Sequence, residues 1–365
     1  MKMKAAVLYQ PKSPLVVEEV ELDGPREGEL LVRMAAASLC HTDLGAIDAD
    51  FPVPVPIVLG HEGAGVVEQV GAGVAKTKPG DHVLLTAAGS CGRCRYCVMG
   101  RHTLCEVFRP LRFGGTLLGG QRRLHRDGQA INHFFMISSF AEYAVVPGEM
   151  AIRVREDAPL DVVCFLGCGG VTGIGSVVNT AGVGMGDSVA VFGCGGVGMN
   201  ALMGARLVGA GKIIAVDILE NKLSLARELG ATHVINAARG DVTGDIRRIT
   251  GGGADCVIVT VRSAEVLVAA FNALRPGGTC VPIAGIPRDT PVTLGSVSFM
   301  DERRMMGCSM GSVKAYLDIP GYIDLYKDGR LPLDKLITRR YPLGDINEAF
   351  ASLEGGEVIK SVIVF

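Results

Sequence analysis

Four cysteines lie close together in one short stretch of the chain. Cys91, Cys94, Cys97 and Cys105 follow the pattern C-x2-C-x2-C-x7-C. Four thiolates fill the tetrahedral coordination of a zinc ion and leave no position for a substrate, so the pattern predicts a structural zinc site. The alternatives are an iron–sulfur cluster, whose spacings differ somewhat, and disulfides, which the reducing compartment suited to 11 cysteines disfavours.

Three further residues of metal-ligand type are spread along the sequence. Cys40 lies in CHTD at 40–43, His61 in GHE at 60–62, and Cys168 in GCGG at 167–170. Alone, each has an ordinary structural explanation. Together they could supply two thiolates and one imidazole to a tetrahedral Zn²⁺, leaving one position open for water or an alcohol oxygen. The remaining cysteines are expected to be small buried apolar residues: Cys164, Cys194, Cys256, Cys280 and Cys308.

A glycine motif follows a short apolar run at 189–192. Gly193, Gly195 and Gly198 form G-x-G-x-x-G, with Gly196 inside it, and 197–208 is apolar at helical spacing. The glycines allow a tight turn, close approach of the backbone to a pyrophosphate, and close packing of helix on strand. The helix N-terminus then offers free N–H groups to the phosphates.

A second β-branched run, 212–216, ends in Asp217. We therefore predict a βαβ unit that binds a dinucleotide. Asp217 would accept hydrogen bonds from the adenosine ribose and would repel a 2′-phosphate, which favours NAD over NADP.

The composition excludes several other functions. The chain has 365 residues, enough for two domains, and a formal net charge of −2, so no nucleic-acid or membrane partner is expected. The N-terminal segment MKMKAAVLYQ lacks the apolar core of a signal peptide, which favours a cytoplasmic protein. The uncharged window 162–186 is rich in glycine, so we expect a buried loop and helix there rather than a membrane span.

The residue pattern predicts a β-rich beginning followed by alternating strands and helices. Strands are predicted at 5–9, 15–20, 30–35, 189–192, 212–216, 232–235, 256–260, 279–284, 336–341 and 360–365, and helices at 197–208, 322–327 and 346–353.

The sequence resembles the zinc-dependent alcohol dehydrogenases of the medium-chain dehydrogenase/reductase superfamily, both liver or class III enzymes and bacterial aryl-alcohol dehydrogenases. The motifs that carry the resemblance span nearly the whole chain: CHTDL at 40–44, GHEGAGVV at 60–67, GDHV at 80–83, the four-cysteine lobe at 91–105, GCGGVTG at 167–173, FGCGGVG at 192–198 and INEAF at 346–350. The resemblance implies an α/β protein with a GroES-like catalytic domain at 1–168 and 310–365, and an inserted Rossmann domain at 169–309.

The resemblance also assigns roles around a catalytic zinc, whose Cys₂His donor set is a match to the family. Cys40, His61 and Cys168 would be its ligands. Thr42 would hold the substrate oxygen and pass its proton outward, and Asp43 would orient the His61 ring. Glu62 would either coordinate the metal transiently or serve as a buried structural carboxylate.

Further cofactor contacts are implied by matching positions. His41 and Lys360 would reach the pyrophosphate, Lys222 the adenosine ribose, and Thr172 and Val197 the nicotinamide. Ile286 is a further predicted cofactor contact. Each has an alternative as an ordinary surface or core residue.

Two departures from the family bear on the substrate. Gly45 stands where liver-type enzymes carry a histidine that ends the proton path. Ala87 replaces the usual aromatic residue of the pocket and so opens volume beside the zinc. Phe134, Phe135, Ile286 and Met310 would line this pocket, which suits aromatic, allylic or long-chain primary alcohols.

The segment 107–137 is unusual in being locally basic and long. Relatives with a comparable segment are commonly dimers, which favours a homodimer over a homotetramer. We expect a solvated basic face here; docking of a substrate carboxylate or a thiol adduct is the alternative. The basic residues are Arg109, Arg112, Arg122, Arg123, His125 and Arg126.

The sequence thus predicts an NAD-dependent zinc enzyme with a small-molecule alcohol or aldehyde as substrate. A thiol-dependent formaldehyde dehydrogenase is the alternative among enzymes. A non-catalytic zinc-binding or redox-sensing protein on the same fold is the alternative of another class.

Overall fold

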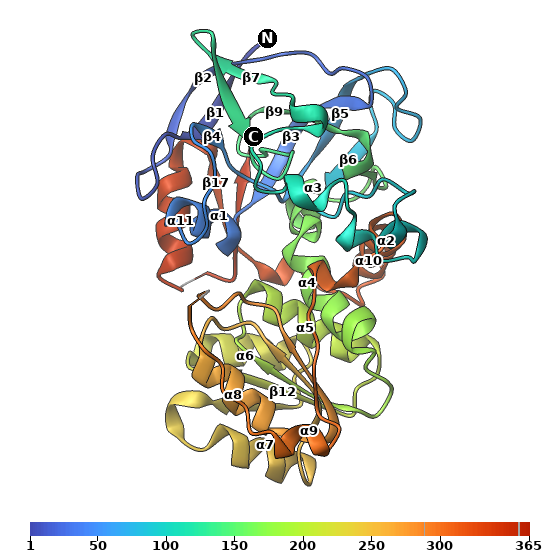
Figure 1. Cartoon of the computed structure of the whole chain (residues 1–365), viewed down its shortest axis with the longest axis vertical. Coiled ribbons are helices and arrows are strands. Elements are labelled where there is room, and N and C mark those ends of the chain that lie inside the picture. Colours follow the sequence, from blue (N-terminus) through green and yellow to red (C-terminus); the bar gives the residue numbers. More distant parts are fainter. Residues whose placement is uncertain (288, 357) are drawn as a thin grey trace. The chain divides into compact units, whose positions relative to one another are not determined.

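The chain forms two structural units (Figure 1). The computed structural model describes residues 1–287, 289–356 and 358–365. The first unit comprises Met1–Cys168 and Lys314–Phe365, and the second comprises Gly169–Val313. The chain therefore leaves the first unit directly after Cys168 and returns to it for the last segment. The sequence places the domain boundaries at 168/169 and 309/310, whereas the units of the structure change at 168/169 and 313/314.

The first unit contains a closed five-stranded barrel and a seven-stranded sheet. The barrel strands, in order around it, are β1 (Lys2–Leu8), β2 (Val16–Leu22), β7 (Leu124–Arg126), β8 (Gln129–His133) and β4 (Ile57–Val58). The sheet order is β10 (Ala151–Arg153), β6 (His82–Leu85), β5 (Gly63–Val70), β3 (Glu29–Ser38), β18 (Lys360–Val364) and β17 (Ile337–Pro342), with β9 (Tyr143–Pro147) also paired with β3.

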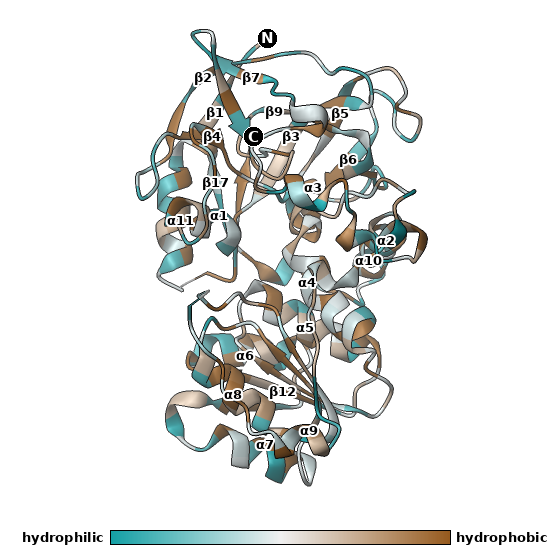
Figure 2. Cartoon of the chain, viewed as in Figure 1, coloured by the Kyte–Doolittle hydropathy of each residue, from teal (hydrophilic) through white to brown (hydrophobic). Residues whose placement is uncertain are grey.

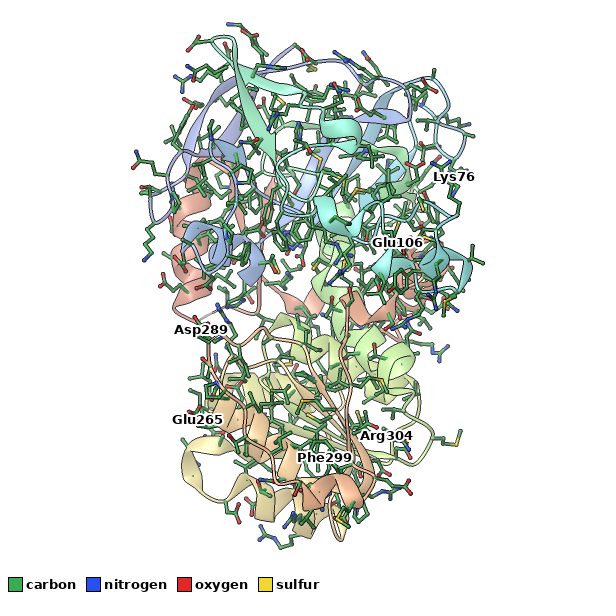
Figure 3. All side chains as sticks on the ribbon, in the orientation of Figure 1. Lys76, Glu106, Glu265, Asp289, Phe299 and Arg304 are labelled. Carbon is green, nitrogen blue, oxygen red and sulfur yellow. The ribbon has the colours of Figure 1, made fainter. Side chains whose placement is uncertain are left out.

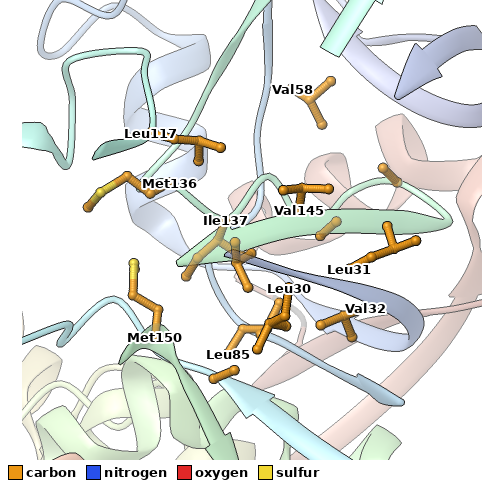
Figure 4. Close-up of a cluster of buried hydrophobic side chains, with 14 of the residues drawn as sticks. Leu30, Leu31, Val32, Val58, Leu85, Leu117, Met136, Ile137, Val145 and Met150 are labelled. Carbon is orange, nitrogen blue, oxygen red and sulfur yellow. The ribbon is translucent and has the colours of Figure 1, made fainter. Parts of the chain in front are cut away.

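Strand β18 brings the end of the chain into the middle of this sheet. It pairs antiparallel with β3, with Val362 opposite Ser38. Leu30, Leu31 and Val32 of β3 are consecutive buried residues of a core that Figure 4 shows together with Leu85 of β6. The helices of this unit are α1 (His41–Ile47), α2 (Arg95–Val98), α3 (Leu160–Val163), α10 (Ala315–Lys327) and α11 (Ile346–Glu354).

The second unit is built on a six-stranded sheet whose strand pairs are all parallel. The strand order is that of a Rossmann fold: β13 (His233–Asn236), β12 (Lys212–Asp217), β11 (Ser188–Phe192), β14 (Ala254–Val259), β15 (Leu274–Pro282) and β16 (Arg304–Met305). Its central strands are buried apolar runs, drawn brown in Figure 2.

The helices of the second unit connect these strands. Two of them begin with a side-chain cap: Asp241 accepts from Gly244 N at 3.0 Å, and Ser263 accepts from Val266 N at 3.2 Å. The helices are α4 (Gly169–Gly175), α5 (Gly196–Leu207), α6 (Glu220–Glu228), α7 (Val242–Thr250), α8 (Ala264–Asn272) and α9 (Val297–Met300). The predicted α/β fold class, with a β-rich part and an inserted Rossmann part, is confirmed.

The uncharged window 162–186 forms short helical segments with largely buried side chains. Within the described residues, no single helix is long and apolar enough to span a membrane. Two consecutive helical segments, Leu160–Gly167 and Gly169–Ala181, together have the length and apolar composition of a membrane span, but they are bent by 63° relative to each other.

Candidate functional site

Four side chains from three distant segments of the first unit meet at one point. The ligand atoms of Cys40, His61, Glu62 and Cys168 all lie within 4.8 Å of one another. Cys40 immediately precedes α1, and His61 and Glu62 immediately precede β5. Because Ser38 N donates to Glu62 O at 2.9 Å, the end of β3 holds the His61 segment beside Cys40. The structure therefore brings together the three residues that sequence comparison assigned to a catalytic zinc.

The His61 ring is fixed by the residue expected to orient it. Its Nδ1 atom lies 3.1 Å from Asp43 Oδ1, which also accepts from Gly60 N at 3.0 Å. Gly60 has φ of +93°, and a Cβ there would lie 2.5 Å from Ser139 Oγ, so the turn before His61 requires glycine. Both Asp43 and His61 are fully buried.

The donor set fits a zinc ion. Within the described chain, the buried Nε2 atom of His61 makes no hydrogen bond, whereas a buried ring nitrogen normally has a partner. Burial opposes protonation of His61, yet the Asp43 carboxylate raises its pKa well above the usual value. Hydrogen bonding to Cys168 lowers the pKa of Cys40 well below its usual value. Hydrogen bonding to Cys40 raises the pKa of Cys168 well above its usual value. Zinc needs a neutral imidazole and thiolates, so its charge would take the place of the protons held by His61 and Cys168. Two sulfurs with one nitrogen are the ligands that zinc prefers.

Behind these ligands lies a buried ion pair. Lys360 Nζ is 2.6 Å from Glu62 Oε2 and donates to Leu39 O at 2.9 Å. Burial raises the pKa of Glu62 to about 7, against the opposing effect of the Lys360 ammonium. Burial opposes the charge of Lys360, but the Glu62 carboxylate raises its pKa. Lys360 therefore balances the charge of Glu62 in this structure, and its contact with a pyrophosphate stays a prediction.

Two predicted substrate-side residues adjoin the cluster. The Thr42 hydroxyl lies 3.7 Å from Cys40 Sγ. Ala87 N donates to Gly167 O at 3.3 Å, which places Ala87 next to the residue that precedes Cys168. Gly45 is buried in α1, and a Cβ there would lie 3.0 Å from the Phe51 ring. A side chain at position 45 would therefore crowd the Phe51 ring.

The second cysteine cluster brings four sulfur atoms together, which is the full ligand set of a tetrahedral ion. The sulfur atoms of Cys91, Cys94, Cys97 and Cys105 lie within 4.8 Å of one another. Backbone N–H groups also point at these sulfurs, as Cys91 N donates to Cys105 Sγ at 3.4 Å. The Glu106 N–H, ahead of other backbone donors, lowers the pKa of Cys94 to about 6. None of the cysteines in the described chain forms a disulfide, so four thiols remain to fill a tetrahedral zinc site.

The glycine loop of the second unit has the shape that a pyrophosphate requires. Gly193 has φ of +92° and packs against Thr260, and a Cβ on Gly198 would collide with Gly193 O. Gly195, by contrast, has nothing within 4 Å of its Cβ position, so its backbone is open to a ligand. It immediately precedes α5, whose first turn includes Gly196 and Val197.

Asp217 lies against this loop at the end of β12. Its carboxylate accepts from Cys194 N at 2.7 Å and from Ile218 N at 2.8 Å. The other predicted residues of the second unit are Thr172 in α4, Lys222 in α6, Ile286 after β15, and Met310 near the end of the unit.

The basic segment is only partly the solvated face that the sequence favoured, because Arg109 and Arg126 are exposed and Arg123 is buried. Arg123 is 1% exposed and donates to both carboxylate oxygens of Glu29, each at 2.9 Å. Arg126 pairs with Glu18, and His125 Nε2 lies 3.0 Å from Asp23 Oδ2. That expectation was wrong for Arg123 because the guanidinium has a buried carboxylate partner far away in the sequence.

Each of the two structural units contains a match to a known family of protein domains. Residues 26–156 match the model of the alcohol dehydrogenase GroES-like domain, and residues 196–328 match that of the zinc-binding dehydrogenases. The NDMA-dependent alcohol dehydrogenase of Amycolatopsis methanolica is 41% identical over 100% of this chain and 99% of its own length. Geraniol dehydrogenase of Castellaniella defragrans is 41% identical over 99% of this chain and 97% of its own length. The structure of benzyl alcohol dehydrogenase from Acinetobacter calcoaceticus is 34% identical in sequence and has a TM-score of 0.96. The match covers 100% of this chain and 99% of that one.

The fold and the cysteine–histidine cluster define a medium-chain, zinc-binding oxidoreductase. The chain belongs to the zinc-dependent alcohol dehydrogenases of this superfamily.

Proposed function

We propose that the protein is an NAD-dependent zinc alcohol dehydrogenase that interconverts primary alcohols and aldehydes, with aromatic, allylic or long-chain alcohols as substrates. The observation that carries this proposal is the convergence of Cys40, His61 and Cys168 around an unpaired, buried His61 Nε2 atom. Zinc held there supplies a positive charge that favours ionisation of an alcohol, and NAD supplies the hydride acceptor.

The side chains of the first unit would do the remaining work. Thr42, whose hydroxyl is 3.7 Å from Cys40 Sγ, would accept the alcohol proton and pass it on. Asp43 holds the His61 ring so that Nε2 points toward the metal ligands. Lys360 offsets the charge of Glu62, which limits the negative charge around the site.

The choice of NAD rests on Asp217. Its carboxylate lies on the backbone of the glycine loop, at Cys194 N. A negative charge in this position accepts hydrogen bonds from a ribose but repels a 2′-phosphate.

The substrate class is inferred from the residues near the metal ligands. Ala87 is small and adjoins Cys168 through Gly167, and Phe134 and Phe135 pack on the His61 ring. A small residue and two aromatic rings beside the metal ligands favour bulky apolar alcohols over ethanol. The names of the geraniol and benzyl alcohol relatives support this choice.

A substrate panel tests the proposal. We expect purified, zinc-loaded enzyme to reduce NAD with benzyl, cinnamyl, geranyl and octyl alcohols at a much higher kcat/KM than with ethanol, and to prefer NAD to NADP. Formaldehyde with and without glutathione or mycothiol tests the thiol-dependent alternative, and NDMA serves as a second acceptor. A higher kcat/KM for ethanol would contradict the substrate class. Zinc binding without activity on any alcohol would instead favour a non-catalytic protein.

We also propose a cytoplasmic homodimer rather than a tetramer. A reducing compartment keeps the thiols of both zinc sites available. Strand β16 is the outer strand of the parallel sheet. Exposed apolar side chains lie on it, at Met305, and on the preceding helix α9, at Val297, Phe299 and Met300. Phe299 and the neighbouring Arg304 are labelled in Figure 3. An apolar, unpaired sheet edge is typical of an interface between chains.

Light scattering tests the dimer. We expect twice the mass of one chain for the wild type and one chain mass for Met300→Glu, because Met300 is 83% exposed and a charge there would be buried by the partner chain. Met185→Glu, which changes an equally exposed methionine outside this edge, should leave the dimer intact. A monomeric wild type would contradict the proposal.

A further inference from the structure

A series of aromatic rings runs outward from the zinc ligand His61. Phe135 stacks on the His61 ring, with centroids 4.8 Å apart and an interplanar angle of 26°. Phe113 meets the Phe135 ring edge-to-face at 5.0 Å, and Phe51 meets Phe113 at 4.7 Å. The Phe134 ring packs against three others, with centroids 5.7 Å from His61, 6.1 Å from Phe113 and 4.8 Å from Phe135. We call Phe51, Phe113, Phe134 and Phe135 the ring series.

Exposure changes sharply along the ring series. His61 and Phe134 are fully buried and Phe135 is 5% exposed, whereas Phe113 is 41% exposed. A single exposed apolar residue is ordinary on a protein surface. Phe113 differs because its covered side rests on rings that contact a metal ligand, so the ring series joins an exposed ring to the reaction centre.

The buried part of the ring series is rigidly held. Phe135 and Met136 have φ of +52° and +60°, a conformation that such side chains rarely adopt. Ser138 Oγ accepts from Phe134 N at 3.0 Å and donates to Val58 O at 2.8 Å, which ties down this turn. Met136 and Ile137 then enter the core shown in Figure 4. The turn with these φ values carries the Phe135 ring that stacks on His61.

The backbone around Phe113 is fixed as well. Arg112 O accepts from Phe135 N at 2.9 Å, which joins the two segments that carry these rings. On the other side, Gly115 has φ of +76°, its carbonyl accepts from His133 N at 2.9 Å, and a Cβ there would collide with Pro54. Phe113 is therefore a partly exposed ring on a backbone that is held on both sides.

We propose that Phe113 is a specificity-determining residue, whose ring packs against the planar part of an aromatic or allylic alcohol. This inference rests on the proposed function and deepens it. Aromatic rings prefer edge-to-face and offset contacts, and such pairs are stabilised beyond the area that they bury. A straight-chain alcohol gains only the apolar contact. Phe113 would therefore favour planar substrates, while Ala87 provides the volume that admits them.

The test compares two alcohols in Phe113→Ala and Phe113→Leu. We expect Phe113→Ala to lower kcat/KM for benzyl alcohol about tenfold, mainly through KM, and that for 1-hexanol only about threefold, because hexanol loses the apolar contact alone. Phe113→Leu, which keeps apolar area without a ring, should retain 1-hexanol activity and lose about threefold with benzyl alcohol. The matched control is Phe365→Ala, since Phe365 is 40% exposed in the same unit and should leave the ratio unchanged.

Calorimetric binding of benzaldehyde to the zinc-loaded protein provides a readout that does not need turnover. We expect Phe113→Ala to raise its Kd about tenfold relative to the wild type and to Phe365→Ala. An unchanged benzyl-to-hexyl ratio with an unchanged Kd would overturn the role of Phe113, as would an equal shift in Phe365→Ala. A wild type that binds benzaldehyde through Phe113 but oxidises no alcohol would overturn the proposed function alone.

Discussion

Replacing Cys168 with serine is expected to lower kcat/KM for benzyl alcohol by at least about three orders of magnitude. The Cys168 sulfur is one of the three proposed ligands within 4.8 Å of one another, and an alcohol oxygen is a much poorer zinc ligand than a thiolate. A bound metal stabilises developing negative charge by several kcal/mol, and about 1.36 kcal/mol corresponds to each factor of ten in rate. Zinc content, measured by plasma mass spectrometry, should fall from two ions per chain to one.

Cys164→Ser is the matched control for this variant. Cys164 is fully buried one short helical turn before Cys168, but it is outside both ligand groups. The same atomic change at Cys164 should therefore keep two zinc ions and activity within about tenfold of the wild type. A Cys168→Ser protein that kept both ions and most of its activity would exclude Cys168 as a catalytic zinc ligand.

Replacing Cys105 with serine should instead damage stability. Cys105 is fully buried and belongs to the closed four-cysteine cluster. A structural zinc contributes its binding energy to folding, so loss of the ion should lower the free energy of unfolding by about 4 kcal/mol. The exposed residues Arg93, Arg95 and Arg101 should become fast tryptic cleavage sites, which limited proteolysis would detect.

Val98→Ser is the control for the lobe. Val98 is 74% exposed between the same cysteines, so this change should leave the metal, the unfolding transition and the proteolysis rate nearly unchanged. If Cys105→Ser kept two zinc ions and the tryptic resistance of Val98→Ser, the cluster would not be a structural zinc site.

Short-range patterns predicted the parts of the fold that depend on local chemistry. The glycine motif placed the start of α5 at Val197, and the helix begins at Gly196, because glycines and an apolar period of 3.6 specify such a turn. The run that ends in Asp217 corresponds to β12, which ends at that residue. The spacing of the four cysteines likewise predicted a cluster, since these residues are at most 14 apart in the sequence.

Other features depend on contacts between distant segments, which carry no local signal. Lys360 and Glu62 are 298 residues apart, and only the insertion of β18 beside β3 brings them together. Arg123 and its buried partner Glu29 are 94 residues apart in the sequence, so the sequence showed Arg123 only as one charge in a basic segment. Phe51 and Phe113 lie outside any helix or strand, so no periodicity linked them to Phe135. Glycine at position 45 was the one available signal, since Phe51 fills the space beside it.

The central claim is that Cys40, His61 and Cys168 hold one zinc ion. Anomalous diffraction at the zinc absorption edge from crystals of the purified enzyme tests it most directly. We predict a peak about 2.3 Å from the Cys40 and Cys168 sulfurs and about 2.0–2.1 Å from His61 Nε2, in addition to a peak among the four clustered cysteines. A crystal of fully metal-loaded, active enzyme with a peak only at the four-cysteine cluster would contradict the account.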